Sequence, residues 1–102
     1  MGSDSSKIMK PEEIESQNPV VVYGSDNCPY CFKVKKIFEE LKVQIDYRNV
    51  DENKKYDEEK QKLMNFLKYD TIPLVFIKKQ FIGGCSNVKE LEAKGELLSK
   101  LA

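Results

Sequence analysis

The stretch VVVYGSDNCPYCFKV occupies residues 20–34 and contains two cysteines separated by two residues. Its first four residues are apolar and largely β-branched, which is typical of a strand buried on both faces. Gly24 begins a turn, and Pro29 suits the first position of a helix, where a missing N–H costs little. The sequence therefore predicts that Cys28 and Cys31 lie at the junction between a buried strand and a helix.

A cysteine at the start of a helix meets free main-chain N–H groups and the positive end of the helix dipole. Both favour an anion, so they lower the pKa of the thiol and make the thiolate a nucleophile near neutral pH. Cys31 lies one turn further on, close enough to attack a mixed disulfide formed at Cys28. We therefore expect Cys28 to attack the substrate disulfide and Cys31 to resolve the mixed disulfide that forms at Cys28. Two alternatives stay open, namely a pair of small core residues and a structural zinc site.

Composition limits the class of protein. The chain of 102 residues is 40% hydrophobic, which is enough for one core. We expect a single domain over residues 11–102, preceded by a flexible lead-in or expression scar at 1–10. Lys plus Arg and Asp plus Glu each number 17, so no charge excess indicates nucleic acid or a membrane surface. No apolar run approaches the ~20 residues that span a bilayer.

The cysteines and the missing histidine limit the chemistry. The chain has three cysteines, Cys28, Cys31 and Cys85. A secreted disulfide framework needs more cysteines and an even number of them. A reducing compartment is therefore expected, and we assign the protein to the cytoplasm, with a trimmed targeting sequence left open. The chain has no histidine, which excludes Ser-His and Cys-His catalysis. A zinc site would need a carboxylate as its fourth ligand.

Periodicity and turn residues predict the order (α)βαβαββα. The expected elements are a short helix at 11–17, a strand at 20–23, a helix from Pro29, a strand at 43–50, a helix at 56–69, strands at 74–77 and 80–82, and a helix beginning at Asn87. The βαβ unit implies a parallel strand pair with a right-handed crossover, and the ββ step implies an antiparallel hairpin. The predicted fold class is α/β, with a small four-stranded mixed sheet flanked by helices.

Two later segments offer main-chain groups to a peptide ligand. Thr71-Ile72-Pro73 precedes a strand, and a proline there invites a cis bond, which would leave the main chain of Ile72 to pair with an extended thiol peptide. Gly83-Gly84-Cys85-Ser86-Asn87 combines two glycines with a helix start that offers N–H groups to a carboxylate. Taken singly, the first segment can also be an ordinary proline at the start of a strand, and the second can be a simple turn followed by a helix cap.

Together, CPYC at 28–31, TIP at 71–73 and GGCSN at 83–87 resemble the glutaredoxin family from about Val20 to the C-terminus. CPYC resembles the dithiol class, whereas the monothiol class carries CGFS. Thioredoxin, with WCGPC, is less similar because this chain has no tryptophan. The resemblance implies a thioredoxin-like fold and glutathione-dependent reduction of protein–glutathione mixed disulfides and protein disulfides. We expect a monomer, because nothing in the sequence requires a dimer.

The resemblance also implies the roles of residues. Cys28 would attack the mixed disulfide, a second glutathione would release the product, and Cys31 would complete exchange with protein disulfides. The Ile72 main chain would pair with the cysteinyl unit, and residues 84–87 would bind the γ-glutamyl carboxylate. Gln61 would contact the glycyl carboxylate. The full set of glutathione-binding residues is Tyr30, Gln61, Thr71, Ile72, Pro73, Gly84, Cys85, Ser86 and Asn87.

The chain departs from the family pattern in its charges. Ser25, followed by Asp26, stands where the family often has a lysine that holds the thiolate. A carboxylate nearby raises a thiol pKa, and the direction of Lys33, Lys35 and Lys36 is not fixed by the sequence. Lys68-Tyr69-Asp70 precedes the TIP motif where a glycine and a basic residue are common, and Asn87 replaces an aspartate.

Glutathione is the expected co-substrate, and no resident metal is expected. One alternative is a module that holds a [2Fe–2S] cluster between two subunits with glutathione as co-ligand, although Pro29 argues against it by family analogy. Another is a thioredoxin-like reductase that receives electrons from a flavoenzyme. Cys85 is either a small buried residue or a thiol that forms a second disulfide or a glutathione adduct.

Overall fold

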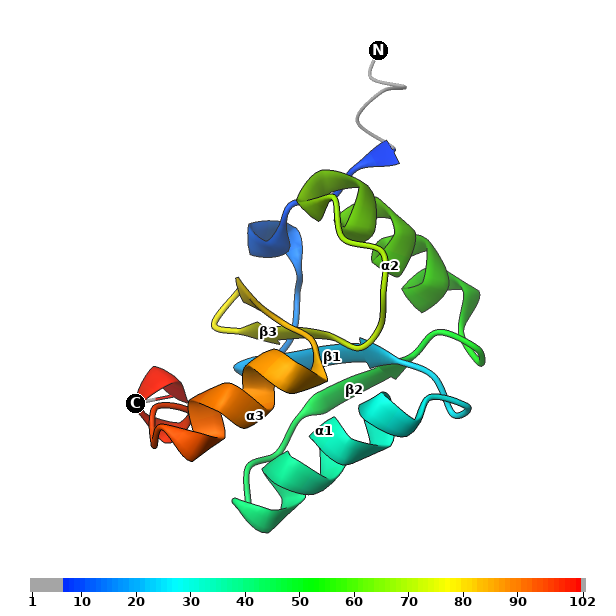
Figure 1. The fold of residues 1–102 in the computed structure, drawn as a ribbon. Helices are drawn as coiled ribbons and strands as arrows, with labels where there is room; N and C mark the ends of the chain where they lie inside the picture. The colour runs from blue at the N-terminus through cyan, green and yellow to red at the C-terminus, as the bar shows by residue number, and fades with distance from the viewer. Residues whose placement is uncertain (1–6, 102) are drawn as a thin grey trace.

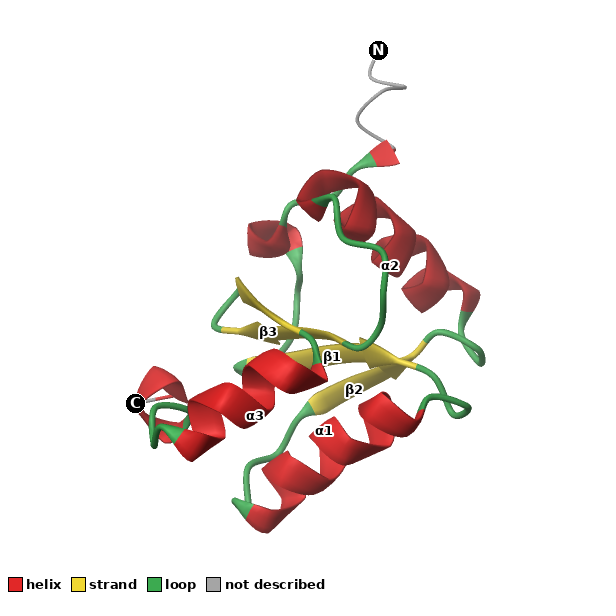
Figure 2. Cartoon of the chain, viewed as in Figure 1, coloured by secondary structure: helices red, strands yellow, loops and turns green. Residues whose placement is uncertain are grey.

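The computed structural model describes residues 7–101 and contains a four-stranded sheet in the order β2-β1-β3-β4 (Figures 1 and 2). The elements are a 3₁₀ turn at Pro11–Glu13, β1 at Val20–Gly24, α1 at Pro29–Glu40, β2 at Asp46–Asn49, α2 at Lys54–Leu67, β3 at Leu74–Ile77, β4 at Gln80–Gly83, α3 at Cys85–Ala93 and a 3₁₀ turn at Leu98–Leu101. None of the helices within residues 7–101 is long and apolar enough to cross a membrane.

Strand β1 lies in the middle of the sheet and fixes its topology. It pairs in parallel with β2, with Val21 opposite Asp46, and antiparallel with β3, with Val22 opposite Val75. β3 and β4 form an antiparallel hairpin. The predicted parallel pair, the predicted hairpin and the predicted α/β class are confirmed.

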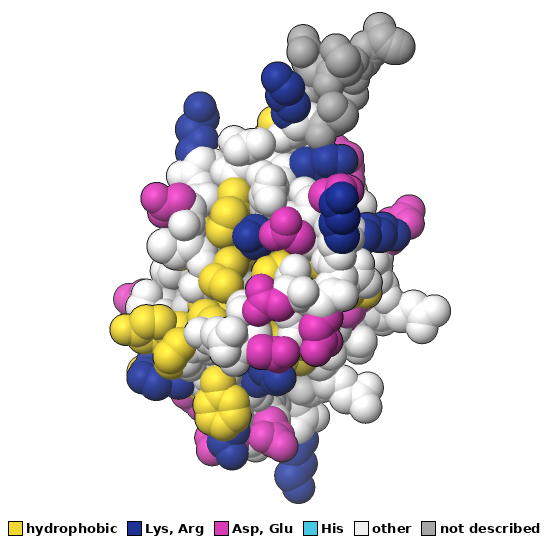
Figure 3. All heavy atoms as spheres, turned by 90° about the vertical axis from the view of Figure 1, so that its right-hand side faces the viewer, with side chains coloured by type: hydrophobic (Ala, Val, Ile, Leu, Met, Phe, Trp, Pro, Cys, Tyr) yellow, Lys and Arg dark blue, Asp and Glu magenta, His cyan; other side chains and the backbone are white. Residues whose placement is uncertain are grey.

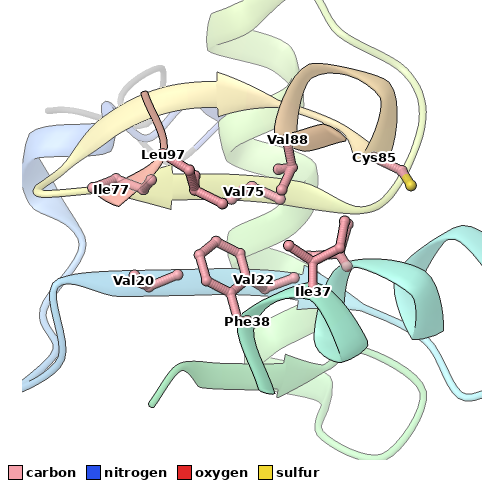
Figure 4. Close-up of a cluster of buried hydrophobic side chains, with 10 residues drawn as sticks. Val20, Val22, Ile37, Phe38, Val75, Ile77, Cys85, Val88 and Leu97 are labelled. Carbon is pink, nitrogen blue, oxygen red and sulfur yellow. The ribbon is translucent and has the colours of Figure 1, made fainter. Parts of the chain in front are cut away.

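Alternate residues of β1 face opposite layers of the molecule. Val20 and Val22 pack with side chains of α1 and α3, and Figure 4 shows this cluster with Phe38 and Val88 between the helices and the sheet. Val21 and Tyr23 point to the other side, where Leu63 of α2 packs. The sheet is therefore covered by α1 and α3 on one face and by α2 on the other, as Figure 1 shows.

The ends of several elements differ from their predicted positions. The opening helix expected at 11–17 is only a 3₁₀ turn, because the chain becomes extended at Ile14 and buries that side chain in the core. Only residues 46–49 of the strand expected at 43–50 pair with β1. Helix α2 starts before the predicted Tyr56, because the Asn53 side chain caps it by accepting a hydrogen bond from the Lys55 N–H at 2.9 Å.

A buried arginine ties the N-terminal segment to the sheet. Arg48, on β2, is 6% exposed, and its guanidinium donates to Asp46, to Glu59 of α2, and to the hydroxyl of Tyr23 on β1. It also donates to the main-chain oxygen of Glu15. The segment before β1 is thus held against the face of the sheet that α2 covers.

Part of the predicted lead-in also contacts α2. The Met9 N–H donates to the Lys62 carbonyl at 3.1 Å, and the Asn65 amide donates to the Lys7 carbonyl at 2.9 Å. Residues 7–10 therefore contribute to the α2 face of the molecule. Residues 1–6 of the predicted lead-in lie outside the described residues.

Candidate active site

Cys28 and Cys31 lie at the first turn of α1, directly after the loop that leaves β1 (Figure 1). Cys28 is the N-cap residue and Pro29 occupies the first helical position, as the sequence predicts. The two sulfurs are joined as a disulfide, with their Cα atoms 5.2 Å apart. The Cys31 N–H points at the Cys28 Sγ from 3.1 Å, so in the reduced protein it can donate to a thiolate at Cys28.

The two cysteines differ in their access to solvent. Cys31 is 0% exposed, whereas Cys28 is only partly buried. A Cβ atom added at Gly24 would lie 2.9 Å from the Cys31 Sγ, so glycine at the end of β1 allows the Cys31 sulfur to pack there. A substrate disulfide can therefore reach the Cys28 sulfur first, while Cys31 is placed to react with a disulfide already formed at Cys28.

A pocket of about 420 Å³ lies next to the dithiol. Its lining residues are Tyr30, Tyr69, Thr71, Ile72, Pro73, Gly84, Cys85 and Ser86. All of the predicted glutathione-binding residues except Gln61 and Asn87 are in this set. The structure thus brings together three segments that are far apart in the sequence: the first turn of α1, the chain before β3 and the start of α3.

The segment before β3 forms one wall of this pocket. The Ile72–Pro73 peptide bond is cis. Because the paired residues of β3 begin at Leu74, the main chain of Ile72 lies outside both strand ladders. A Cβ atom at Gly84 would lie 3.4 Å from the Pro73 carbonyl oxygen. A glycine at position 84 therefore lets the start of α3 approach this wall closely.

Tyr69 is a lining residue that the sequence did not point out. Its ring packs edge-on against Phe81 with centroids 4.9 Å apart, and its hydroxyl would lie 3.1 Å from a Cβ atom at Gly84. It also lines a neighbouring pocket of about 520 Å³ with Gln61 and Lys68. The signal available in the sequence was an aromatic residue two positions before Thr71.

Gln61 and Asn87 do not line the pocket next to the dithiol. Gln61 faces the neighbouring pocket, and its amide donates to Asp57 one turn earlier in α2 at 2.9 Å. Helix α3 begins at Cys85, before the predicted Asn87, because the Asn87 side chain accepts a hydrogen bond from the Gly84 N–H at 3.0 Å and closes the first turn. Asn87 thus organises the N-terminus of α3, whose first residues line the pocket.

The residues around Ser25 form an acidic wall on the other side of Cys28. The Ser25 hydroxyl donates to Asp51, and the Tyr47 hydroxyl donates to the Ser25 carbonyl at 3.2 Å. Burial, together with the charges of Asp26 and Asp51, raises the pKa of Tyr47 above its ordinary value of 10.0. Figure 3 faces the side of the molecule on which the loop before α1 lies, and it shows both acidic and basic side chains on this face.

The described residues offer no ligand cluster for the zinc alternative. Within residues 7–101, no group of three or more histidine, cysteine, aspartate or glutamate side chains is arranged to hold a metal ion. Cys85 is buried and free, and it lines the pocket next to the dithiol rather than approaching the Cys28–Cys31 pair as a third sulfur ligand.

Comparison with known proteins agrees with this geometry. The model of the family described as Glutaredoxin matches residues 20–82. Glutaredoxin-C6 of Oryza sativa subsp. japonica is 34% identical over 94 residues, covering 92% of this chain and 84% of the relative. The holo form of glutaredoxin C1 from Populus tremula x tremuloides superimposes with a TM-score of 0.82 at 32% identity, covering 96% of this chain and 86% of the other. A buckwheat glutaredoxin in complex with glutathione gives 0.83 at 30% identity, covering 99% and 94%.

A sheet of this topology with a dithiol at the N-terminus of α1 defines a thiol–disulfide oxidoreductase with a thioredoxin-like fold. The family match and the relatives make the assignment more specific: the chain belongs to the glutaredoxin family. Its CPYC sequence and its Cys28–Cys31 disulfide fit the dithiol class.

Proposed function

We propose that the protein reduces protein–glutathione mixed disulfides and protein disulfides with glutathione as the electron donor. The observation that carries this proposal is the pocket next to the dithiol, which shares Tyr30 with the CPYC turn. A tripeptide thiol bound there would present its sulfur to Cys28. The buckwheat relative, described in complex with glutathione, supports the choice of ligand.

The exchange begins when the Cys28 thiolate attacks the glutathione sulfur of a mixed disulfide. A bond forms between Cys28 and glutathione, and the protein substrate leaves as a thiolate that takes a proton from water. A second glutathione thiolate then attacks the glutathione sulfur on Cys28. This step releases oxidised glutathione and returns Cys28 as a thiolate, so one added glutathione is consumed and the other half of the oxidised glutathione comes from the substrate.

For protein disulfides, Cys31 takes the second step. Cys28 first forms a mixed disulfide with the substrate, and the Cys31 thiolate then attacks the Cys28 sulfur. The substrate leaves reduced, and the Cys28–Cys31 disulfide forms. One glutathione then attacks this disulfide at Cys28 and a second removes the resulting glutathionyl group, so two glutathione molecules leave as oxidised glutathione and return both thiols. The full burial of Cys31 supports this division of roles, since Cys31 needs to meet no sulfur other than that of Cys28.

We assign glutathione to the pocket in an extended conformation. Its cysteinyl unit would pair with the main chain of Ile72. Its γ-glutamyl carboxylate would accept from the N–H groups of Cys85 and Ser86 at the start of α3, which Asn87 holds in place. Its glycyl carboxylate would extend toward the neighbouring pocket, where Lys68 supplies a positive charge beside Gln61.

The cellular setting follows from the same chemistry. We propose a monomer with its catalytic domain over residues 11–102, acting in the cytoplasm, where glutathione keeps thiols reduced. The balance of charge, 17 Lys plus Arg against 17 Asp plus Glu, supports protein and glutathione partners rather than nucleic acid or a membrane surface.

The roles of the two cysteines are tested by comparing two substrates in two variants. Cys28→Ser should abolish turnover of both a glutathionylated peptide and a protein disulfide in a glutathione-coupled assay. Cys31→Ser should retain turnover of the glutathionylated peptide and lose most turnover of the protein disulfide. Loss of both activities in Cys31→Ser, in protein that melts like the wild type, would contradict the assigned roles.

The pocket is tested with Gly84→Val. The added bulk would meet the Tyr69 hydroxyl and the Pro73 carbonyl, so we expect KM for the glutathionylated peptide to rise about tenfold or more. Ala93→Val adds the same kind of bulk at the exposed C-terminal end of α3 and serves as the control. An unchanged KM in Gly84→Val would place the glutathione site elsewhere.

A further inference from the structure

A thiolate at Cys28 needs a positive charge nearby, and the loop before α1 does not supply one. This point rests on the proposed role of Cys28 as the nucleophile. Position 25 holds a serine, which carries no charge. Its hydroxyl donates a hydrogen bond to Asp51. Asp26 follows it and is exposed. The loop before α1 thus presents a carboxylate and no cation to Cys28, and a carboxylate opposes ionisation of a thiol.

Cys28 lines a second, smaller pocket that has one lysine in its wall. This pocket measures about 140 Å³, and its lining residues are Ser25, Asp26, Cys28, Phe32, Lys35 and Tyr47. Asp26 and Lys35 line the same small space as Cys28, so the charges of both side chains act on this cysteine.

The helix geometry explains why Lys35 is the lysine that reaches this pocket. Phe32 and Lys35 are three residues apart on one face of α1, and Cys28 caps the start of this helix. All three line the same pocket. The Lys35 ammonium is held 4.2 Å from the centroid of the Tyr47 ring, and Tyr47 is itself fixed by its hydrogen bond to the Ser25 carbonyl. A cation over a tyrosine ring is positioned without being neutralised.

The other two lysines of this part of α1 have different partners. The Lys33 ammonium lies 5.2 Å from the centroid of the Tyr30 ring. The Lys36 ammonium lies 3.9 Å from the carboxylate of Glu39. Neither of these lysines lines the pocket that contains Cys28, so the three neighbouring lysines are not equivalent.

We propose that Lys35 is a positioning residue whose ammonium, held on the Tyr47 ring, stabilises the Cys28 thiolate and offsets the carboxylates of Asp26 and Asp51. The pocket next to the dithiol adds the titratable groups Tyr30, Tyr69 and Cys85, none of which is a cation. The charged and titratable groups of the smaller pocket come from four segments. The loop before α1 gives Asp26, β2 gives the neutral Tyr47, the loop after β2 gives Asp51 through Ser25, and α1 gives Lys35. Lys35 is the cation in this set.

The test measures the acidity of Cys28 rather than turnover, so that it is independent of the proposed glutathione chemistry. The rate of iodoacetamide alkylation of the reduced protein is followed against pH, and mass spectrometry confirms that the label is on Cys28. Lys35→Met keeps the apolar stem and removes the charge. We expect the pKa of Cys28 to rise by about half to one unit, which slows alkylation about three- to tenfold below the pKa.

Two further variants and a change of salt make the result specific. Lys35→Arg should restore most of the wild-type profile, and Lys36→Met should leave it unchanged. The difference between wild type and Lys35→Met should shrink in about 1 M salt, because screening acts on a charge and not on packing. An unchanged pKa in Lys35→Met, or an equal shift in Lys36→Met, would overturn the proposal. Wild-type protein whose Cys28 is alkylated as expected, but which does not turn over the glutathionylated peptide, would instead contradict the proposed function.

Discussion

At the scale of single residues, the loop before α1 makes the thiol of Cys28 sensitive to acidic neighbours. Asp26 lines the same small pocket as Cys28, so removing its charge should favour the thiolate. Asp26→Asn should therefore lower the pKa of Cys28 by a few tenths to about one unit, measured by alkylation against pH. Glu39→Gln, which removes a charge at the far end of α1, serves as the control. A pKa that stays the same or rises in Asp26→Asn would contradict this electrostatic description.

Tyr23 gives a prediction about stability at high pH. Burial and its hydrogen bond to Glu59 raise the pKa of Tyr23 above its ordinary value of 10.0, although Arg48 acts in the opposite direction. The folded state therefore keeps the proton after the unfolded chain has lost it. The stability that this proton contributes is fully present below pH 10 and is lost as pH rises above it.

The measurement compares urea unfolding of wild type and Tyr23→Phe between pH 7 and about 11. At neutral pH the variant should be less stable by about 1 kcal/mol, because the hydroxyl no longer bonds to Glu59 and Arg48. Above pH 10 the wild type should lose stability more steeply than the variant. Parallel curves in this window would show that Tyr23 does not carry the effect.

At the scale of elements, α2 depends on its N-terminal cap. The Asn53 side chain accepts from the Lys55 N–H at 2.9 Å, and Leu63 is the one fully buried side chain of this helix. Asn53→Ala should destabilise the protein by about 1 kcal/mol, seen as a lower urea midpoint. Asn53→Asp keeps a capping oxygen and should lose little. Equal losses in the two variants would mean that the cap is not the cause.

The sequence predicted the elements around the dithiol better than those around α2. Local rules were sufficient where Pro29 starts a helix after a buried strand, so α1 begins as predicted. They were insufficient at Ile14, whose burial against distant residues ends the first helical turn early. The start of α3 was also predicted too late. The Asn87 side chain accepts a hydrogen bond from the Gly84 N–H, so Asn87 lies within the first turn of the helix instead of at its start.

In the candidate site, too, motifs made of neighbouring residues were predictable, whereas contacts between distant elements were not. The three motifs were recognisable in the sequence, and the structure brings seven of the nine predicted glutathione-binding residues, those other than Gln61 and Asn87, to one pocket. Tyr69 and the partner of Lys35 were not predictable, because both depend on contacts between elements. The direction of a lysine side chain on a helix is decided by what lies opposite it, here Tyr47 on β2.

At the scale of the whole molecule, Arg48 links β1, β2, α2 and the segment before β1. Its side chain is 8% exposed, and its partner carboxylates Asp46 and Glu59 are 26% and 16% exposed. Arg48→Met would leave these carboxylates partly buried without their cation, so we expect a loss of about 3 kcal/mol in unfolding free energy. The measurement is urea unfolding, with Lys89→Met on the exposed face of α3 as the control. A loss no larger than in the control would show that the cluster contributes little.

The central claim is that Cys28 carries glutathione during turnover, and trapping that adduct tests it most directly. Reduced Cys31→Ser protein is mixed with oxidised glutathione, and the labelled cysteine is located by peptide mass spectrometry. We predict one glutathionyl group on Cys28, removed by added glutathione at the rate of turnover, with Cys85 unlabelled because it is buried. An adduct on Cys85, or no adduct on Cys28, would contradict the account.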